Sequence, residues 1–326
     1  MDILNANDLQ QRAHQALRRG REPQKLTLAY AGISLTMGLA VFFLNLWLDA
    51  QISGTGGLRN LGTRAIFSTI QQALPILSSF VLMCLELGFL SGMMRISRGQ
   101  YADHTDLKVG FEKFWPLFRL SLIQMLVYCA VAFIAMQIGS AIFLLTPWAE
   151  PLMEVLYPLY ESQSLLLTEE LMNEFLELML PMFLVVGVVL LALLVPVLFR
   201  MRMAYFCLLE DPRGRAMAAI RESSRMMRRR FGQMLKIDLR LWSYYLVTVA
   251  VLVVLYLDVI LAMLGVSLPV SAKALAAAVY FAAAGLQFVC HMFLRPRAEI
   301  TYLLAYDRLR EKPKDDGVVL GNIFDM

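Results

Sequence analysis

The chain contains six apolar runs of about 20 residues, the length at which an α-helix crosses the ~30 Å hydrocarbon layer of a bilayer. The runs cover residues 26–48, 73–94, 120–145, 179–199, 241–263 and 274–294. Hydrophobic residues make up 59% of the chain, more than the roughly one-half that is usual in soluble domains. An outer-membrane barrel would instead contain alternating segments of about 10 residues, and the sequence has none. We therefore predict an all-α polytopic membrane protein with six transmembrane helices.

The basic stretch 200–240 orients these predicted spans. It holds eleven Lys or Arg against four Asp or Glu, and cytoplasmic loops of membrane proteins carry the excess of Lys and Arg. Together with 1–25, 95–119 and 295–326 it contains 27 of the 30 Lys and Arg residues. The stretch 147–178, by contrast, has seven Glu and no Lys or Arg. We expect both termini to be cytoplasmic and 147–178 to be an acidic outer loop. A re-entrant segment in that loop would change the number of spans.

By the same reasoning the chain divides into a cytoplasmic segment (1–25), a transmembrane domain (26–294) and a cytoplasmic tail (295–326). Short amphipathic helices are predicted at the cytoplasmic face, because apolar residues there recur every three to four positions. These helices cover 6–20, 106–118, 213–235 and 298–310, with Asp8 and Asp106 at the starts of the first two. Residues 1–25 are polar, so we interpret the first apolar run as an uncleaved span rather than a signal peptide.

Glu86 is the one acidic residue placed deep inside a predicted span. Such a group costs about 2.5–3.5 kcal/mol on insertion scales and points by default to a function. Two interpretations follow. Glu86 binds a proton or a cation on a transport path, or it is hydrogen-bonded to another span, with Gln124 and Tyr245 as the expected partners.

Small residues predict where helices pack closely. Gly88 and Gly92 are four positions apart in the second run, and the sixth run contains the alanine groups 276–278 and 282–284. Small residues at this spacing allow the backbones of neighbouring helices to approach. We interpret them as packing sites.

Five arginines in the central basic stretch form the second candidate site: Arg221, Arg225, Arg228, Arg229 and Arg230. They lie next to an apolar face of the predicted helix 213–235, an arrangement suited to anionic lipid headgroups or to a protein partner. The alternative is that this charge only sets the topology. Nucleic acid is a poor partner, because this stretch must lie against the bilayer.

Motifs for catalysis or for metal binding are missing from the sequence. It has no Gly-rich phosphate loop, no His-Glu-x-x-His motif and no catalytic triad pattern, and its three His residues are scattered. Glu170, Glu174 and Glu177 share a predicted helix face, which favours a solvated acidic surface over a weak divalent-cation site. The four Cys residues are expected to be unpaired packing residues. We predict no enzymatic activity, no cofactor and no metal.

Part of the basic stretch resembles a known bacterial membrane family. The run Ala218-Ala219-Ile220-Arg221-Glu222-Ser223, then Met226-Met227-Arg228 and Phe231, is similar to the cytoplasmic signature of domain of unknown function 975. Pro296 followed by Leu304-Ala305-Tyr306 is similar to the end of that family's pattern. The resemblance implies a six-helix protein of the bacterial cytoplasmic (inner) membrane without an established activity. It also implies a distant similarity to the membrane domain of some glycerophosphodiester phosphodiesterases.

Two function classes follow from the sequence. The first is a structural or regulatory membrane protein whose basic inner face binds lipid headgroups, a protein partner or a second copy of itself. The second is a proton- or cation-coupled transporter that uses Glu86. The first is favoured at this point, because a substrate path usually needs several intramembrane polar groups and Glu86 is the only deep one in the sequence.

Overall fold

The computed structural model describes residues 5–18, 22–54, 61–154, 169–228, 230–257 and 272–311. These residues contain helices and turns and no strand. Five helical segments are long and apolar enough to cross a membrane: Pro23–Ile52, Gly62–Ser97, Phe114–Leu144, Leu178–Glu210 and Ala277–Glu311. A sixth crossing is reached only if a bent pair of shorter helices is one span. The all-α prediction and the membrane-length helices are confirmed, while the count of six and the orientation stay predictions.

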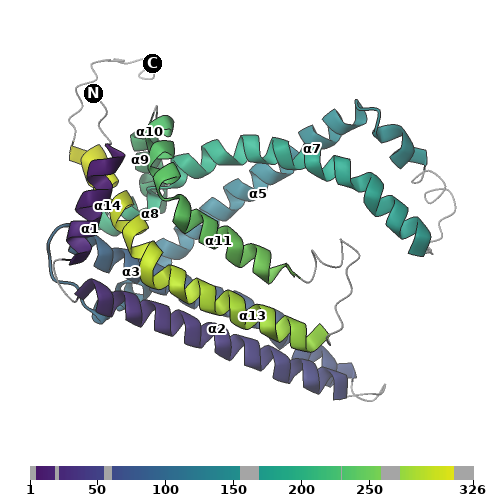
Figure 1. Ribbon diagram of the computed structural model, residues 1–326, viewed down its shortest axis with the longest axis horizontal. Helices are drawn as coiled ribbons and strands as arrows, with labels where there is room; N and C mark the ends of the chain where they lie inside the picture. Colours follow the sequence, from purple (N-terminus) through teal and green to yellow (C-terminus); the bar gives the residue numbers. More distant parts are fainter. Residues whose placement is uncertain are drawn as a thin grey trace. The chain divides into compact units, whose positions relative to one another are not determined.

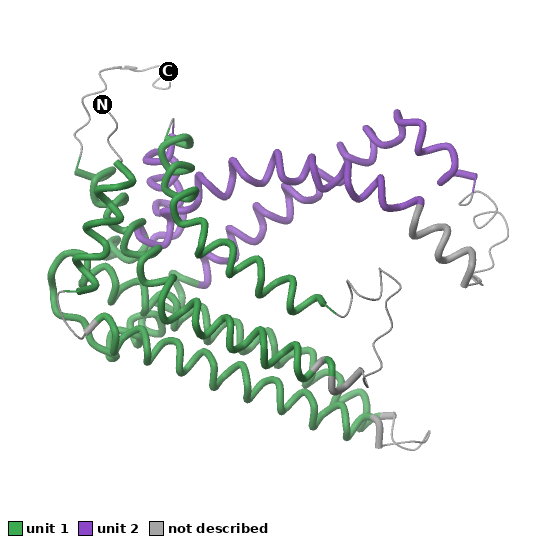
Figure 2. Tube along the Cα trace, in the orientation of Figure 1, with its two compact units in different colours: residues 1–117, 208–214, 229–326 green, residues 118–207, 215–228 purple. Residues whose placement is uncertain are grey.

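The chain forms two compact units, shown in different colours in Figure 2. Unit 1 comprises residues 1–117, 208–214 and 229–326, and unit 2 comprises 118–207 and 215–228. Each unit is built from segments that are distant in sequence. We describe the two in turn.

In unit 1 the long helices α2 (Glu22–Gly54) and α3 (Leu61–Ser97) pack along each other. Helix α13 (Ala272–Val289) lies beside α2, and α11 (Trp242–Leu255) lies beside α13 (Figure 1). Both long helices exceed the predicted spans 26–48 and 73–94. Pro75 lies inside α3 without ending it.

The predicted packing role of Gly88 and Gly92 is confirmed. A Cβ atom on Gly88 would overlap the backbone of Leu107 in η2 (His104–Lys108), and one on Gly92 would overlap the side chain of Leu26. Gly110 in α4 (Val109–Glu112) approaches the carbonyl group of Cys84 in the same way. Glycine at these positions lets η2 and α4 lie directly against α3.

The helix predicted at 298–310 is confirmed, but its predicted surface position is wrong. Helix α14 (Arg295–Glu311) continues from α13 through the π-helical turn η3 (Cys290–Leu294), and ten of its seventeen residues are buried. It packs against α3 and against α1 (Ala6–Arg18). The sequence signal failed because the helix is buried around most of its circumference, so no single apolar stripe marks it.

The predicted amphipathic helix 213–235 is two helices, α9 (Ala216–Met227) and α10 (Phe231–Arg240). The buried face of α9 is formed by Ala216, Ala219, Ser223 and Met227, whereas Met217 is exposed. Helix α10 then meets α11 at an angle of 73°. The described part of the predicted span 241–263 is therefore the short α11, and the rest of that span lies outside the described residues.

The predicted start of the first amphipathic helix at residue 6 is confirmed, whereas Asp8 and Asp106 do not begin their helices as expected. Helix α1 begins at Ala6, and the backbone N–H of Asn7 donates to the Asn5 side chain, so Asp8 is not the cap. The cap of η2 is Asp103, and Asp106 closes a capping box with it. Asp106 is buried and pairs with Arg95 at 2.8 Å.

Unit 2 is built around a pair of long helices, α5 (Phe114–Leu144, which enters the unit at Phe118) and α7 (Glu169–Met201). A small core of Phe143, Ala149 and Leu152 joins them, with apolar side chains of α7 packed against it. Because α7 is continuous from Glu169, the separate surface helix predicted before the fourth span is wrong. Helix α9 is attached through the Ser223 hydroxyl, which accepts from the Met203 backbone N–H and donates to the Arg200 carbonyl.

Candidate functional site

The strongest candidate site is an ion pair between Glu86 of α3 and Arg295 at the start of α14. A guanidinium nitrogen of Arg295 donates to one carboxylate oxygen of Glu86. The Glu86 side chain is 50% exposed, whereas the Arg295 side chain is only 10% exposed. The pair therefore has one accessible member and one buried member.

The surroundings of Arg295 hold its guanidinium in place. It donates to the Tyr30 hydroxyl at 2.6 Å and lies over the rings of Tyr30 and Phe89, at 5.0 and 5.6 Å from their centres. Glu299, one helical turn further along α14, is 3.5 Å away. A buried charge is costly unless it is paired and hydrogen-bonded. The terminal nitrogens of Arg295 meet that requirement through Tyr30 and Glu86, whereas its buried Nε has Glu299 at 3.5 Å and no hydrogen bond among the described residues.

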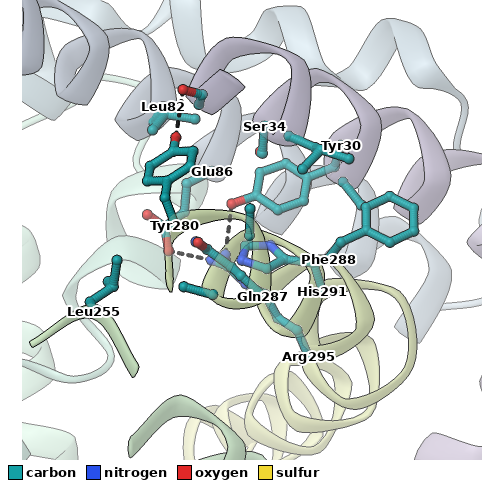
Figure 3. Close-up of a pocket in the computed structure, with 15 residues that line it drawn as sticks. Tyr30, Ser34, Leu82, Glu86, Leu255, Tyr280, Gln287, Phe288, His291 and Arg295 are labelled. Atoms are coloured by element: carbon teal, nitrogen blue, oxygen red, sulfur yellow. Dashed lines mark hydrogen bonds and ion pairs between the residues drawn. The ribbon is translucent and has the colours of Figure 1, made fainter. Parts of the chain in front are cut away.

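The pair lines a cavity of about 370 Å³ in unit 1. Figure 3 shows its polar lining, which comes from α2, α3, α13, η3 and the start of α14: Tyr30, Ser34, Glu86, Tyr280, Gln287, His291 and Arg295. The Tyr280 hydroxyl donates a hydrogen bond to the Gly38 carbonyl oxygen at 2.5 Å. The Nδ1 atom of His291 is buried and has no hydrogen-bond partner among the described residues.

A local change of helix geometry accompanies this lining. Gln287, His291 and Arg295 are four positions apart, so they project from the same side of the continuous helix. The five residues Cys290–Leu294, which include His291, form a π-helical turn. Such turns are rare and occur frequently at functional sites. The polar side of the helix thus faces the cavity at its least regular point.

The cavity holds the carboxylate of Glu86, which is already paired with the cationic side chain of Arg295. Any other cation would have to compete with Arg295 for it. Ionised Glu86 is an acceptor only, and Arg295 remains protonated in proteins. A proton or a cation entering the cavity can take the carboxylate from Arg295. Tyr30 and Glu299 would still hold the guanidinium after such an exchange.

The structure answers the question of what Glu86 contacts. Its partner is Arg295, which the sequence analysis assigned to the cytoplasmic tail, so the expected partners Gln124 and Tyr245 were wrong. The Tyr245 hydroxyl instead bonds Tyr302 at 2.7 Å and Asp238 at 3.3 Å.

The structure describes four of the five arginines of the predicted basic site. Arg221, Arg225 and Arg228 are exposed on α9 and directly after it, and Arg225 is 3.5 Å from Glu222. Arg230 is only partly exposed and belongs to unit 1, whereas α9 belongs to unit 2. Arg229 lies outside the described residues, as do the side chains of Glu170, Glu174 and Glu177.

An open groove of about 680 Å³ runs beside α9 in unit 2. Its charged lining consists of three arginines and one glutamate, namely Arg119, Arg215, Arg221 and Glu222, and Leu122, Ile123 and Met217 contribute apolar surface. This groove combines the two properties expected of a headgroup site. Only one of the five predicted arginines, Arg221, lines it.

A second ionic cluster joins three helices of unit 1. Arg98, at the end of α3, pairs with Asp307 of α14 at 2.6 Å and also with Glu210 of α8 (Ala204–Glu210). Glu210 in turn accepts from Tyr306 at 2.6 Å and pairs with Arg310. The hydrogen bond to Asp307, followed by that to Glu210, raises the pKa of Arg98. The cluster ties α14 to the end of α3.

Sequence reasoning missed most of the cavity lining. His291 was treated as an isolated histidine, and Tyr30, Gln287 and Arg295 were not considered together. The available signal was the four-residue spacing of Gln287, His291 and Arg295, which places three polar side chains on one side of the last apolar helix.

Comparison with known proteins gives no independent assignment. No family model, curated protein or solved structure matches the chain. The similarity to domain of unknown function 975 therefore stays a prediction.

Proposed function

We propose that the protein is a membrane transporter coupled to a proton or a cation through Glu86. The observation that carries this proposal is the half-exposed carboxylate of Glu86 in a polar cavity, paired with buried Arg295. The sequence favoured a structural role because Glu86 was the only deep polar group. Arg295, His291, Gln287 and Tyr30 now stand beside it, which supplies the additional polar groups that a substrate path requires.

In this mechanism Glu86 alternates between two partners. With Arg295 it closes an ion pair that contributes no net charge to the cavity. When a proton or a cation occupies the carboxylate, Arg295 keeps its contacts with Tyr30 and Glu299, and α3 is released from the start of α14. A change of partner that alters the contact between two helices is the kind of two-state element that coupling needs.

Flux through reconstituted vesicles tests the proposal. The full chain is placed in liposomes that contain a pH-sensitive dye, and gradients of protons, Na⁺ or K⁺ are imposed with an extract of small polar metabolites outside. We expect the wild-type chain to dissipate at least one gradient. We expect Glu86→Gln to reduce the rate to that of empty liposomes.

Because Glu86→Gln leaves Arg295 without its carboxylate, a folding control is needed. The double variant Glu86→Gln with Arg295→Met removes both charges, so it should fold and still lack flux. Wild-type flux in a correctly folded double variant would contradict the proposal, as would a wild-type chain that dissipates none of the gradients.

The second candidate function is a structural or regulatory role in which the basic face binds anionic lipid headgroups. The groove beside α9 favours it, because Arg119 and Arg221 there adjoin exposed Leu122 and Met217. We expect Arg119→Gln with Arg221→Gln to lower binding of the full chain to soluble short-chain phosphatidylglycerol. Unchanged binding would count against this role.

A further inference from the structure

A second basic cavity lies in unit 1, away from the ion pair of Glu86 and Arg295. It has a volume of about 600 Å³ and is lined by α1, the first residues of α2, η3 and the start of α14. Three cationic side chains line it, namely Arg18, Lys25 and Arg297, and all three are exposed. No acidic side chain is among its described lining residues.

These cations lack strong partners within the part of the chain that the structure describes. None of the three takes part in an ion pair there, although the charge of Lys25, after the hydrogen bonds from His104, is one of the causes that lower the pKa of Asp103. The backbone carbonyl of Arg297 is used by Thr301, but that contact leaves its guanidinium unaffected. Three cations around one cavity repel one another, and a bound anion would relieve that repulsion.

Apolar side chains complete the lining and indicate the source of the anion. Leu28 of α2 is 54% exposed and Phe293 of η3 is 64% exposed, and both line the same cavity. They belong to two of the helices long and apolar enough to cross a membrane. Lys25 lies within four residues of Leu28 on one helix, and Arg297 lies within four residues of Phe293 on the other. The charged and the apolar side chains are therefore at similar positions along the two helices.

We infer that this cavity binds the headgroup of an anionic phospholipid. Arg18, Lys25 and Arg297 hold the phosphate, and Leu28 with Phe293 contacts the first part of the acyl chains. A free phosphate would use the three cations but would leave the apolar residues uncovered. The inference is independent of the transport proposal, because it uses none of the residues around Glu86.

Bound lipid also has a structural consequence. The cavity is lined by α1, α2 and α14, so a headgroup bound there would add to the Asp8–Arg308 ion pair in holding the N-terminal helix against the helix that carries Arg295. Basic residues at a membrane surface favour anionic over zwitterionic lipid. Three of them give a preference that lipid exchange can measure.

Native mass spectrometry of the full chain in mild detergent tests the inference. The protein is exposed to phosphatidylglycerol, to phosphatidylcholine or to inorganic phosphate, and retained adducts are counted. The test variant carries Arg18→Gln, Lys25→Gln and Arg297→Gln. The control variant carries Arg64→Gln, Lys108→Gln and Arg213→Gln, which removes the same charge from exposed positions outside the cavity.

We expect the wild-type and control chains to retain phosphatidylglycerol in preference to phosphatidylcholine, and the test variant to retain fewer phosphatidylglycerol molecules. Equal retention by the test and control variants would overturn the inference. Retention of inorganic phosphate without a preference for phosphatidylglycerol would overturn the assignment to a lipid. A test variant that is not monodisperse is replaced by Arg297→Gln alone, which must show the same direction of change.

Discussion

Arg295 donates to Glu86 across 209 positions of sequence, and this contact joins α3 to the helix formed by α13, η3 and α14. The two residues differ in burial. The Arg295 side chain is 10% exposed and its guanidinium stays protonated in proteins, whereas the half-exposed Glu86 side chain lines a cavity. This difference makes the effects of substituting the two residues unequal.

Glu86→Gln should destabilise the protein more than Arg295→Met. Removing the carboxylate leaves a buried cation without its main partner, at a cost of about 3–5 kcal/mol. Removing the guanidinium leaves an accessible carboxylate, at a cost of about 1–3 kcal/mol. The free energy of unfolding in mixed micelles would measure both.

The double variant with Glu86→Gln and Arg295→Met provides the control for this comparison. It should be more stable than Glu86→Gln alone, because no unpaired charge remains in it. Additive losses of stability in the double variant would show that the two side chains do not interact.

Gly88→Ala should destabilise unit 1 by about 1–3 kcal/mol, the usual cost of overpacking. The added methyl group would overlap the backbone of Leu107, which cannot move as a flexible side chain does. Gly32→Ala is the matched control, since a methyl group there meets no atom within 4 Å and alanine favours the helix. Thermal unfolding of the two variants would measure the difference. Equal midpoints would contradict the close contact between α3 and η2.

Arg98→Gln should loosen α14 from the end of α3. Arg98 bonds two carboxylates, Asp307 and Glu210, and we expect a loss of about 1–2 kcal/mol after allowance for its partial exposure. Arg98→Lys should restore only part of this, because an ammonium group lacks the planar fork of a guanidinium. Hydrogen exchange of the α14 backbone would report the change. Exchange rates in α14 that are the same in all three chains would contradict this role of Arg98.

The docking of α1 on α14 should weaken in acid. The hydrogen bond from Arg308, and then that from Arg12, lowers the pKa of Asp8. A carboxyl group whose pKa is lower in the folded than in the unfolded state stabilises the fold above the unfolded value, about 3.9, and loses that contribution as the pH falls through the folded value. Proteolysis between α1 and α2 should therefore accelerate only below about pH 4. Asp8→Asn should remove this dependence, and an unchanged pH profile in that variant would contradict the assignment.

The sequence was sufficient to predict that the chain is helical, but not where each helix begins and ends. Apolar runs identified the helical class, and Gly88 with Gly92 identified a close contact, because these features depend on local composition and spacing. Helix α14 was misjudged because its partners α1 and α3 are distant in sequence. Its charged residues Arg308 and Asp307, which suggested solvent exposure, instead pair with those helices.

The candidate site was predicted in part for a similar reason. Glu86 stood out because a carboxylate inside an apolar run is costly. Arg295 did not stand out, because it directly follows the last apolar run and was counted among the positive charges of the cytoplasmic tail. Its burial depends on the rings of Tyr30 and Phe89, contacts that no local pattern encodes.

In the proposed mechanism, Glu86 exchanges Arg295 for a proton or a cation. Infrared difference spectroscopy of the full chain in bilayers measures this directly, by following the carboxyl C=O stretch while pH, Na⁺ or K⁺ is varied. We predict a carboxyl band that appears in acid or shifts with one cation, and that is absent in Glu86→Gln. A wild-type spectrum that matches that of Glu86→Gln under every condition would contradict the account.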